Sequence, residues 1–462
     1  MYGKLLLVVI LAAFWLVSVE LPGVAGSLSL EYVLSQRMSV RVWDDRVLED
    51  GVARMVCRVA LSSSFDLSGM LVYLCNGTGT YRYDGQSGVF VLRVVGDVRG
   101  ELGVVVDQTF ISSAPAVLVV VYDEEVEPSA VVASWKAGVV VQSLYVAAVR
   151  YGLGGVSVGD GVYRSGVSSA LQSRLGLSAR FRPVILFPLG YLSPWESYPD
   201  GELGNTSGNL LSPLESSVDV ALVLGGQPGL VESWAGLGLS DEKLSGLLWA
   251  SYGFSLLGTG HRTVPSAYGV YPFRIFVANG SGTFEYVPDV HSLSRLRGTD
   301  ERSGIVAGAG GPDYLKGAPA LLIYCWDSEG GAVNASDADS GGRWINLGFG
   351  CCLQNLCLSA AVWNVSISDA FHTRSFEAVR VRLADGGLSS VFPMYVVGVG
   401  AAARMREDVN GDGVINILDI VIVAKAFGSR PGDWNWNPDA DFDGNGLVNI
   451  LDVFRVAKKF GS

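Results

Sequence analysis

The sequence APAVLVVVYD, from Ala114 to Asp123, returns in altered form as APALLIYCWD, from Ala318 to Asp327. Both stretches are apolar runs that end in aspartate, and the β-branched content of the first is typical of a buried strand. The repeat extends outward, since GTYRY from Gly79 matches GTFEY from Gly282. Further matches pair Gly138, Gln142, Leu144 and Ala148 with Gly350, Gln354, Leu356 and Ala360. The chain is therefore predicted to contain two homologous halves.

Each half repeats one coarse order of elements, in which strands and helices are mixed. A long apolar helix follows the buried strand, at about residues 136–150 in the first half and 344–363 in the second. A final strand is expected at ILFPLG in the first half and at MYVVGVG in the second. This mixture predicts an α+β fold for residues 27–192 and 218–402. The Ser-, Pro-, Gly- and Asn-rich stretch 193–217 is expected to be the linker.

A second repeat occupies the C-terminus, where DVNGDGVINILDIVIVAKAFGS is followed by DFDGNGLVNILDVFRVAKKFGS. Each copy fits a twelve-residue calcium loop followed by a helix, a spacing that places oxygen ligands around one ion. Gly413 and Gly446 stand at the sixth position, where the sharp turn needs a positive φ. The predicted ligands of two Ca²⁺ ions are Asp408, Asn410, Asp412, Val414, Asn416 and Asp419 in the first loop, and Asp441, Asp443, Asn445, Leu447, Asn449 and Asp452 in the second, with the carbonyls of Val414 and Leu447.

The twelfth loop position is Asp rather than Glu, and no helix is predicted to enter either loop. In both respects residues 405–462 resemble the dockerin family, so a small all-α module is expected there. The resemblance implies a cohesin-type domain as partner, bound through the positions after the loop ligands, which are Ile417, Leu418, Ile450 and Leu451. Because this pair is identical in both copies, two binding orientations would be allowed. The alternative is a calcium-stabilised cap without a partner.

The N-terminus has the layout of a secretory signal. Lys4 precedes an apolar run from Leu5 to Val17, and small residues follow up to Gly26. This run is shorter than the ~20 residues that a membrane-spanning helix needs. Residues 1–26 are therefore predicted to be a cleaved signal peptide, with no membrane span afterwards and a secreted, extracellular or cell-surface location. A retained transmembrane anchor is the alternative.

Charge and cysteine content narrow the classes of function. The formal net charge is −12, and no basic stretch is present, so nucleic acid is not an expected partner. The six cysteines permit disulfides whose pairing the sequence leaves open, and buried free thiols are the alternative.

Several motifs of the two halves occur in an informative order. The first half has LEYVLSQRMSVRVW from Leu30 and AGVVVQSLYVAAVRYGLGG from Ala137. The second has LSGLLWASYG from Leu244 and HRTVPSAYGVYPF from His261. These segments resemble the opening Arg-Arg-Ser-x-Arg run, the central helix and the Pro-Ser loop of the flavin-dependent nitroreductases, in particular the SagB-type dehydrogenase branch. The resemblance covers nearly all of residues 28–400, as two copies.

The resemblance implies a flavin site shared between two copies. Nitroreductases are usually homodimers in which the opening run of one subunit grips the phosphate of FMN and the Pro-Ser loop of the other lies against the flavin ring. The second half lacks the opening run, and the first half lacks the loop. An intramolecular pseudo-dimer with one composite FMN site is therefore expected. Its residues would be Arg37, Ser39 and Arg41 from the first half, and Pro265, Ser266, Ala267, Tyr268 and Gly269 from the second.

Two departures from the family pattern affect this expectation. Gln36 replaces the first arginine of the opening run, and Tyr268 stands where the branch usually has glycine. If both flavin sites had decayed, Arg37 and Arg41 would be only a solvated helix face.

The sequence thus predicts a secreted flavin-dependent oxidoreductase that acts on a small-molecule redox substrate and is assembled through a calcium-binding module. No catalytic acid or base is assigned, because flavin supplies the hydride chemistry. The alternative is a non-catalytic pseudoenzyme that acts as an extracellular binding or scaffold protein, since nicotinamide donors are scarce outside cells. A serine hydrolase is disfavoured, because the GVSVG motif at Gly155–Gly159 is not expected to follow a strand.

Overall fold

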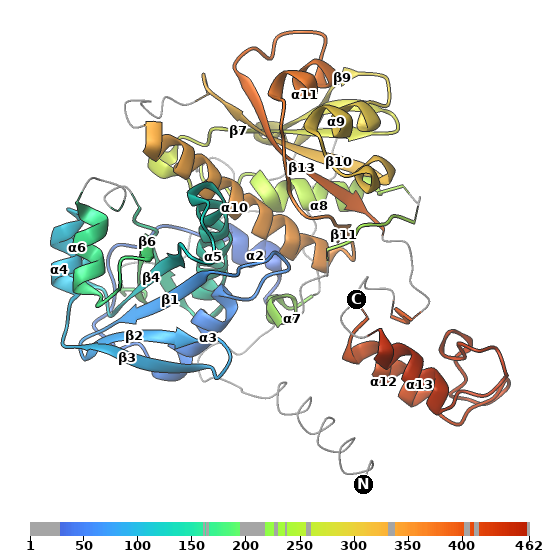
Figure 1. The fold of residues 1–462 in the computed structure, drawn as a ribbon, viewed down its shortest axis with the longest axis horizontal. Coiled ribbons are helices and arrows are strands. Elements are labelled where there is room, and N and C mark those ends of the chain that lie inside the picture. The colour runs from blue at the N-terminus through green and yellow to red at the C-terminus, as the bar shows by residue number, and fades with distance from the viewer. Residues whose placement is uncertain are drawn as a thin grey trace.

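The computed structural model contains two α+β halves and a small C-terminal module (Figure 1). The predicted signal peptide and most of the predicted linker lie outside the residues that the structure describes. The described residues are 28–159, 162, 166–194, 218–225, 230–235, 238–255, 260–330, 338–401, 407–410 and 415–459.

The first half is built on an antiparallel sheet of order β3-β2-β1-β4-β6-β5. All of β4 is buried, because Leu118 and Val120 face α3 and α5 while Val117 and Val119 face α4 and α6. The strands are β1 (Met70–Cys75), β2 (Gly79–Asp84), β3 (Val89–Val95), β4 (Ala116–Asp123), β5 (Leu153–Gly155) and β6 (Phe181–Tyr191). The helices are α2 (Leu30–Ser35), α3 (Asp50–Ala60), α4 (Arg99–Val105), η1 (Thr109–Ser113), α5 (Ala130–Arg150) and α6 (Val167–Arg174).

The second half has a sheet of order β11-β13-β10-β7-β8-β9, and β12 also pairs with β13. Its strands are β7 (Phe273–Asn279), β8 (Gly282–Val287), β9 (Ser292–Arg297), β10 (Ala320–Asp327), β11 (Ser366–Ile367), β12 (Phe371–His372) and β13 (Val391–Gly400). Its helices are α7 (Val220–Gly225), α8 (Asp241–Tyr252), η2 (Ala267–Gly269), η3 (Pro288–Val290), α9 (Arg302–Ala309), η4 (Asp313–Gly317), α10 (Ala338–Val362) and α11 (Phe376–Leu383).

The two halves share one topology, as the internal repeat predicts. In the first half β4 lies between β1 and β6, and in the second half β10 lies between β7 and β13. The long apolar helices α5 and α10 follow β4 and β10 in the chain. The α+β class and the two fused halves are thus confirmed. The helix α5 begins at Ala130 rather than near Lys136, because the Ser129 hydroxyl accepts a hydrogen bond from the Val132 amide at 3.2 Å and caps an earlier start.

The halves join where α10 crosses α5, between the two sheets (Figure 1). Glycine is required at the crossing on both helices. A Cβ atom on Gly138 would lie 1.9 Å from the Leu347 carbonyl oxygen, and one on Gly350 would lie 1.9 Å from that of Trp135. Trp135 stands three residues before Gly138, and Leu347 stands three residues before Gly350. Each glycine therefore meets the equivalent carbonyl of the other helix, and the crossing is close to twofold symmetric. The fused halves therefore pack as an intramolecular pseudo-dimer.

Buried polar groups also connect the halves. The Gln142 amide donates hydrogen bonds to Asn355 Oδ1 at 2.8 Å and to the Thr263 carbonyl at 3.2 Å. The Ser63 hydroxyl donates to Gln354 Oε1 at 3.0 Å. All six cysteines are buried free thiols, which is the alternative that the sequence left open beside disulfides.

Two helices of the described residues are long and apolar enough to cross a membrane, Ala130–Arg150 and Gly342–Val362. Both are mostly buried, at 78% and 83% of the tested stretch. They are α5 and the greater part of α10, the core helices of the two halves, and their hydropathy reflects burial between the sheets.

The C-terminal module consists of α12 (Ile417–Lys425) and α13 (Ile450–Lys458), with a single turn, η5 (Pro438–Ala440), between them. It has its own core, formed by Val409, Ile415, Val423, Ala426, Ala440, Phe442, Val448 and Val456. The segment that follows α12 pairs with the second loop, where the Gly428 amide donates to the Val448 carbonyl at 2.8 Å and the Val448 amide donates to the Ser429 carbonyl at 3.1 Å. The expected small all-α module is confirmed.

Candidate functional site

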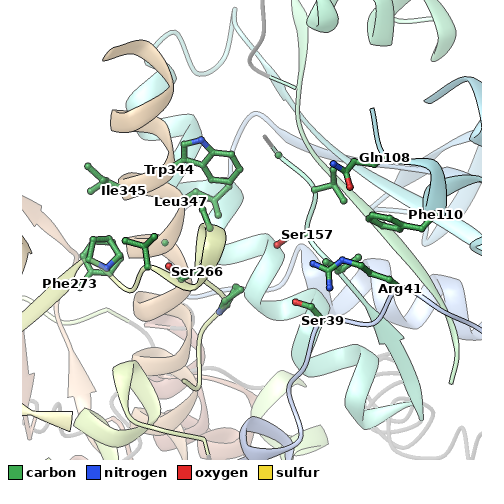
Figure 2. A pocket seen from close by; sticks show the side chains of 18 residues that line it. Ser39, Arg41, Gln108, Phe110, Ser157, Ser266, Phe273, Trp344, Ile345 and Leu347 are labelled. Carbon is green, nitrogen blue, oxygen red and sulfur yellow. The ribbon is translucent and has the colours of Figure 1, made fainter. Parts of the chain in front are cut away.

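A cavity of about 320 Å³ lies between the two halves (Figure 2), within the range of roughly 300–1,000 Å³ that small-molecule sites occupy. Among the described residues the lining has one charged side chain, Arg41, and no acidic one. The first half contributes Ser39, Arg41, Gln108, Phe110, Val156, Ser157, Val158 and Gly159; the second contributes Pro265, Ser266, Ala267, Val270, Pro272, Phe273, Trp344, Ile345, Leu347 and Gly348.

The wall from the first half is held by short strand-like contacts. Ser39 forms a parallel bridge with Gly155, and the Val40 amide donates to the Gly155 carbonyl at 3.0 Å. The Trp43 indole donates to the Gly154 carbonyl at 2.8 Å. These contacts place the exposed side chains of Ser39 and Arg41 at the cavity, with the Arg41 guanidinium 5.8 Å from the Phe110 ring.

The wall from the second half comes from the segment that begins at Pro265. The Ser266 hydroxyl accepts a hydrogen bond from the Tyr271 amide at 2.9 Å, which fixes the turn around η2. Pro265, Ser266 and Ala267 line the cavity, whereas Gly269 does not; it is exposed and has a φ of +70°. The side chain of Tyr268 lies outside the described part of the chain.

Arg37 does not line the cavity, which corrects the expected role of this residue. Its side chain is 5% exposed, and its Nε and Nη2 donate to the Arg262 carbonyl at 3.3 and 3.2 Å. The guanidinium also lies 5.3 Å from the centre of the Tyr145 ring. A backbone carbonyl of the second half thus accepts hydrogen bonds from an arginine of the first. Arg37 joins the two walls rather than pointing into the space between them.

Ser157, in the GVSVG motif, also differs from its sequence-based interpretation. A strand, β5, does lead into the motif, contrary to expectation. The chain then stays extended, because the Val158 amide donates to the Leu186 carbonyl at 2.8 Å. The Ser157 amide donates to the Tyr145 hydroxyl at 2.9 Å. The strand–turn–helix geometry of a nucleophile elbow is absent at Ser157, which is instead a polar part of the cavity wall.

The pseudosymmetry locates the position that would form a second cavity. Gly348, which lines the cavity, stands two residues before Gly350; the corresponding residue before Gly138 is Lys136. The Lys136 side chain is 5% exposed, and its Nζ lies 3.1 Å from Glu127 Oε2 and 3.3 Å from Asp66 Oδ2. A buried, ion-paired lysine therefore stands at the position that corresponds to Gly348.

Three of the predicted ligands in the second calcium loop lie close together. Carboxylate oxygens of Asp441, Asp443 and Asp452 all lie within 4.8 Å of one another. Gly446 has a φ of +76°, and its amide donates to Asp441 Oδ2 at 2.9 Å. The Asn445 amide donates to Asp443 Oδ1 at 3.1 Å. These bonds curl the loop around a concentration of negative charge that suits a hard cation.

The last aspartate of each loop connects the loop to its helix. Asp452 is 1% exposed and accepts hydrogen bonds from the Phe442 and Asn449 amides, both at 2.8 Å. Asp419 likewise accepts from the Val409 amide at 2.7 Å and from the Asn416 amide at 2.9 Å. Among the other predicted ligands of the second loop, Asn449 caps α13, and the Leu447 carbonyl accepts a hydrogen bond from the Asn449 side-chain amide at 3.1 Å. In the first loop Asp408 is buried, and the Asn410 amide donates to Asp419 Oδ1. Asp412, Gly413 and Val414 lie outside the described residues.

The comparisons with known proteins agree with this arrangement. Residues 406–461 match the dockerin type I domain family. The C-terminal module is a dockerin type I domain. The helices of this dockerin module expose apolar side chains, including Leu418 at 55%, Ile450 at 57% and Leu451 at 64%, which are three of the four expected docking positions; the fourth, Ile417, is half-buried.

The two halves have a nitroreductase-like fold. A crystal structure described as a nitroreductase from Anabaena variabilis has a TM-score of 0.60 and 14% sequence identity, over 82% of this chain and 93% of that chain. A Methanocaldococcus jannaschii protein named as a nitroreductase is 26% identical over 153 residues, which are 31% of this chain and 76% of that protein. A Desulfovibrio desulfuricans nitroreductase solved with FMN covers 37% of this chain and 90% of that chain, at 18% identity and a TM-score of 0.29.

Sequence reasoning missed several lining residues. Gln108 and Phe110 lie next to or within η1, and Trp344 lies near the start of α10, so only the packing of the two halves brings them to one cavity. The sequence held a usable signal at one position, where the first half has Lys136 and the second has Gly348. This difference predicts more room beside Gly348 than beside Lys136.

Proposed function

We propose that the two fused halves bind one FMN in the cavity between them and act as a flavin-dependent oxidoreductase on a small-molecule redox substrate. The proposal is supported above all by the composition of the cavity. Arg41 and Ser39 of the first half and the Pro265–Ala267 segment of the second, the residues expected from the nitroreductase resemblance, line the same space.

The lining suits the chemistry of a flavin mononucleotide. A guanidinium and hydroxyl groups are good donors to phosphate oxygens, and Arg41, Ser39 and Ser157 offer them without a competing acid among the lining residues. Apolar side chains such as Val158, Ile345 and Leu347 suit a planar ring and exclude water. Bound FMN would supply the hydride chemistry at its N5 atom, and the protein would bind, orient and shield it.

The location and partner form the second part of the proposal. We infer that the protein is secreted after cleavage of a signal peptide at residues 1–26. Dockerin domains bind cohesins, so the dockerin module would attach the two halves to a cohesin-type domain outside the cell. The apolar side chains that α12 and α13 expose support this docking role.

A non-catalytic binding or scaffold protein is the second candidate function. The position of Arg37 favours it, because one of the three expected phosphate contacts is used for the Arg262 carbonyl instead. Measured flavin occupancy distinguishes the two candidates.

The first prediction concerns stoichiometry. After incubation with excess FMN and desalting, the purified protein without its signal segment is expected to retain about one FMN per chain, because Lys136 fills the counterpart position. Visible absorbance against protein concentration measures the ratio. Retention of two FMN per chain would contradict the filled second position, and retention of none would favour the scaffold protein.

The second prediction concerns Arg41. Arg41→Ala is expected to weaken FMN binding about 10- to 100-fold, because a hydrogen bond to a charged group contributes roughly 1.5–3 kcal/mol. Fluorescence titration of FMN measures the dissociation constant. Arg46→Ala is the matched control, since Arg46 pairs with Asp44, lies over Tyr191 and does not line the cavity. Equal affinities for the Arg41 and Arg46 variants would exclude a phosphate contact by Arg41.

A further inference from the structure

The indole of Trp344 gives the cavity a wall that the first half does not repeat. Trp344 stands six residues before Gly350 on α10, and the residue six before Gly138 on α5 is Val132. Trp344 is half-buried and lines the cavity, whereas Val132 does not. The aromatic wall is therefore an asymmetric feature of this chain.

The indole reaches across the junction onto the first half. A Cβ atom on Gly159 would lie 2.8 Å from Cη2 and 3.2 Å from Cζ3 of the Trp344 ring. Gly159 is not among the residues with positive φ, so its backbone does not require glycine. The absence of a side chain at residue 159 instead leaves room for the indole and for Ile185, whose Cδ1 would lie 2.7 Å from such a Cβ atom, so Gly159 and Trp344 form a close contact between the halves.

Trp344 bounds a different side of the cavity from the anion-binding groups. Figure 2 shows it across the cavity from Ser39 and Arg41, on the same side as Ile345 and Leu347. A ligand whose phosphate contacts Arg41 would thus leave the region next to Trp344 for its ring and for a second molecule. An aromatic ring in the wall favours flat rings in offset or edge contact, and its bulk limits the width of a second molecule that binds beside the flavin.

We propose that Trp344 is a specificity-determining residue that restricts the redox partner of the cavity to a narrow, flat ring. This inference rests on the proposed flavin function and specifies its substrate class by shape. The partner would be a single-ring compound that accepts or donates a hydride, and fused polycyclic rings would be excluded.

The test measures binding, without turnover. The FMN-loaded full-length protein without its signal segment is titrated with benzoate and with anthracene-9-carboxylate, two redox-inert acids that differ in ring width. Changes in the visible spectrum of the flavin report the two dissociation constants. Trp344→Ala is expected to tighten binding of anthracene-9-carboxylate at least about tenfold and to change benzoate binding less than about threefold, since pocket size discriminates by such factors.

Two further variants make the result specific. Trp344→Phe keeps an aromatic contact with Gly159 and is expected to show an intermediate effect, which preserves the test if the alanine variant does not fold. Val132→Ala changes the pseudosymmetric position and is expected to leave both dissociation constants unchanged. Equal shifts for both acids, or no shift, in the Trp344 variants would overturn the proposal.

Failure of the flavin proposal gives a different result. If the unaltered protein retains no FMN, the proposed function fails, and the same two acids are then titrated into the flavin-free protein by tryptophan fluorescence. In Trp344→Ala the fluorescence of the remaining tryptophans is followed. A selective gain of anthracene-9-carboxylate binding in this variant would still support Trp344 as the size-limiting wall. Lack of selectivity in that titration would overturn it.

Discussion

Gly138→Ala is expected to lower the free energy of unfolding of the two halves by at least ~3 kcal/mol. Overpacking usually costs about 1–3 kcal/mol, and here the new methyl group would meet a backbone carbonyl that cannot rotate away, 1.9 Å from the Leu347 oxygen. The helices α5 and α10 would have to separate, and the cavity that their halves enclose would change with them. Urea denaturation followed by circular dichroism measures the change.

The symmetry of the crossing provides an internal comparison. Gly350→Ala places its methyl group 1.9 Å from the Trp135 oxygen and is expected to have a similar effect. Gly51→Ala is the control, because a Cβ atom on this exposed helical glycine would have no neighbour within 4 Å, and alanine is the better helix former by about 1 kcal/mol. A loss of stability in Gly51→Ala equal to that in Gly138→Ala would show that helix contact is not the cause.

Removal of calcium is expected to unfold the dockerin module while the two halves remain folded. Without an ion, the carboxylates of Asp441, Asp443 and Asp452 repel one another within 4.8 Å. An ion that binds only the folded form stabilises it by about 2.7 kcal/mol at a concentration 100 times its dissociation constant. Calorimetric scans with calcium and with a chelator should therefore differ in one transition, and the transition of the halves should not move.

Asp452→Asn is expected to weaken calcium binding to the second loop about 10- to 100-fold, as loss of charge and of supporting bonds does in metal sites. The backbone N–H groups of Phe442 and Asn449 both donate to the Asp452 carboxylate. In the asparagine variant the side-chain NH₂ group would face one of these donors, and that hydrogen bond would be lost. Asp433→Asn makes the same charge change outside both loops and is the control. Titration calorimetry measures both affinities, and an unchanged affinity in Asp452→Asn would exclude this aspartate as a ligand.

The fold could be predicted from the sequence where local patterns repeat. The strands β4 and β10 follow from apolar runs that recur in both halves, and the dockerin module follows from two loops in register. The start of α5 could not be placed correctly from the pattern, because a single hydroxyl, that of Ser129, decides it. Such a cap is one weak signal among many serines in the chain.

The site was less predictable, because side-chain direction depends on packing. Sequence pattern singled out Ser39, Arg41 and Ser266, which line one cavity, but it could not show that Arg37 turns to the Arg262 carbonyl. The cavity contribution of Trp344 likewise depends on Gly159, more than 180 residues away in the chain, having no side chain. Contacts between the halves carry no local sequence signature.

The covalent link between the halves has a consequence for dilute conditions. A site shared by two separate subunits is lost when the protein is diluted below the dissociation constant of the dimer, because association of the subunits depends on protomer concentration. In this chain the two walls are tethered, so the encounter of Arg41 with the Pro265–Ala267 segment is intramolecular, with an effective concentration fixed by the tether. A single molecule held on a surface by its dockerin module would therefore keep a complete cavity.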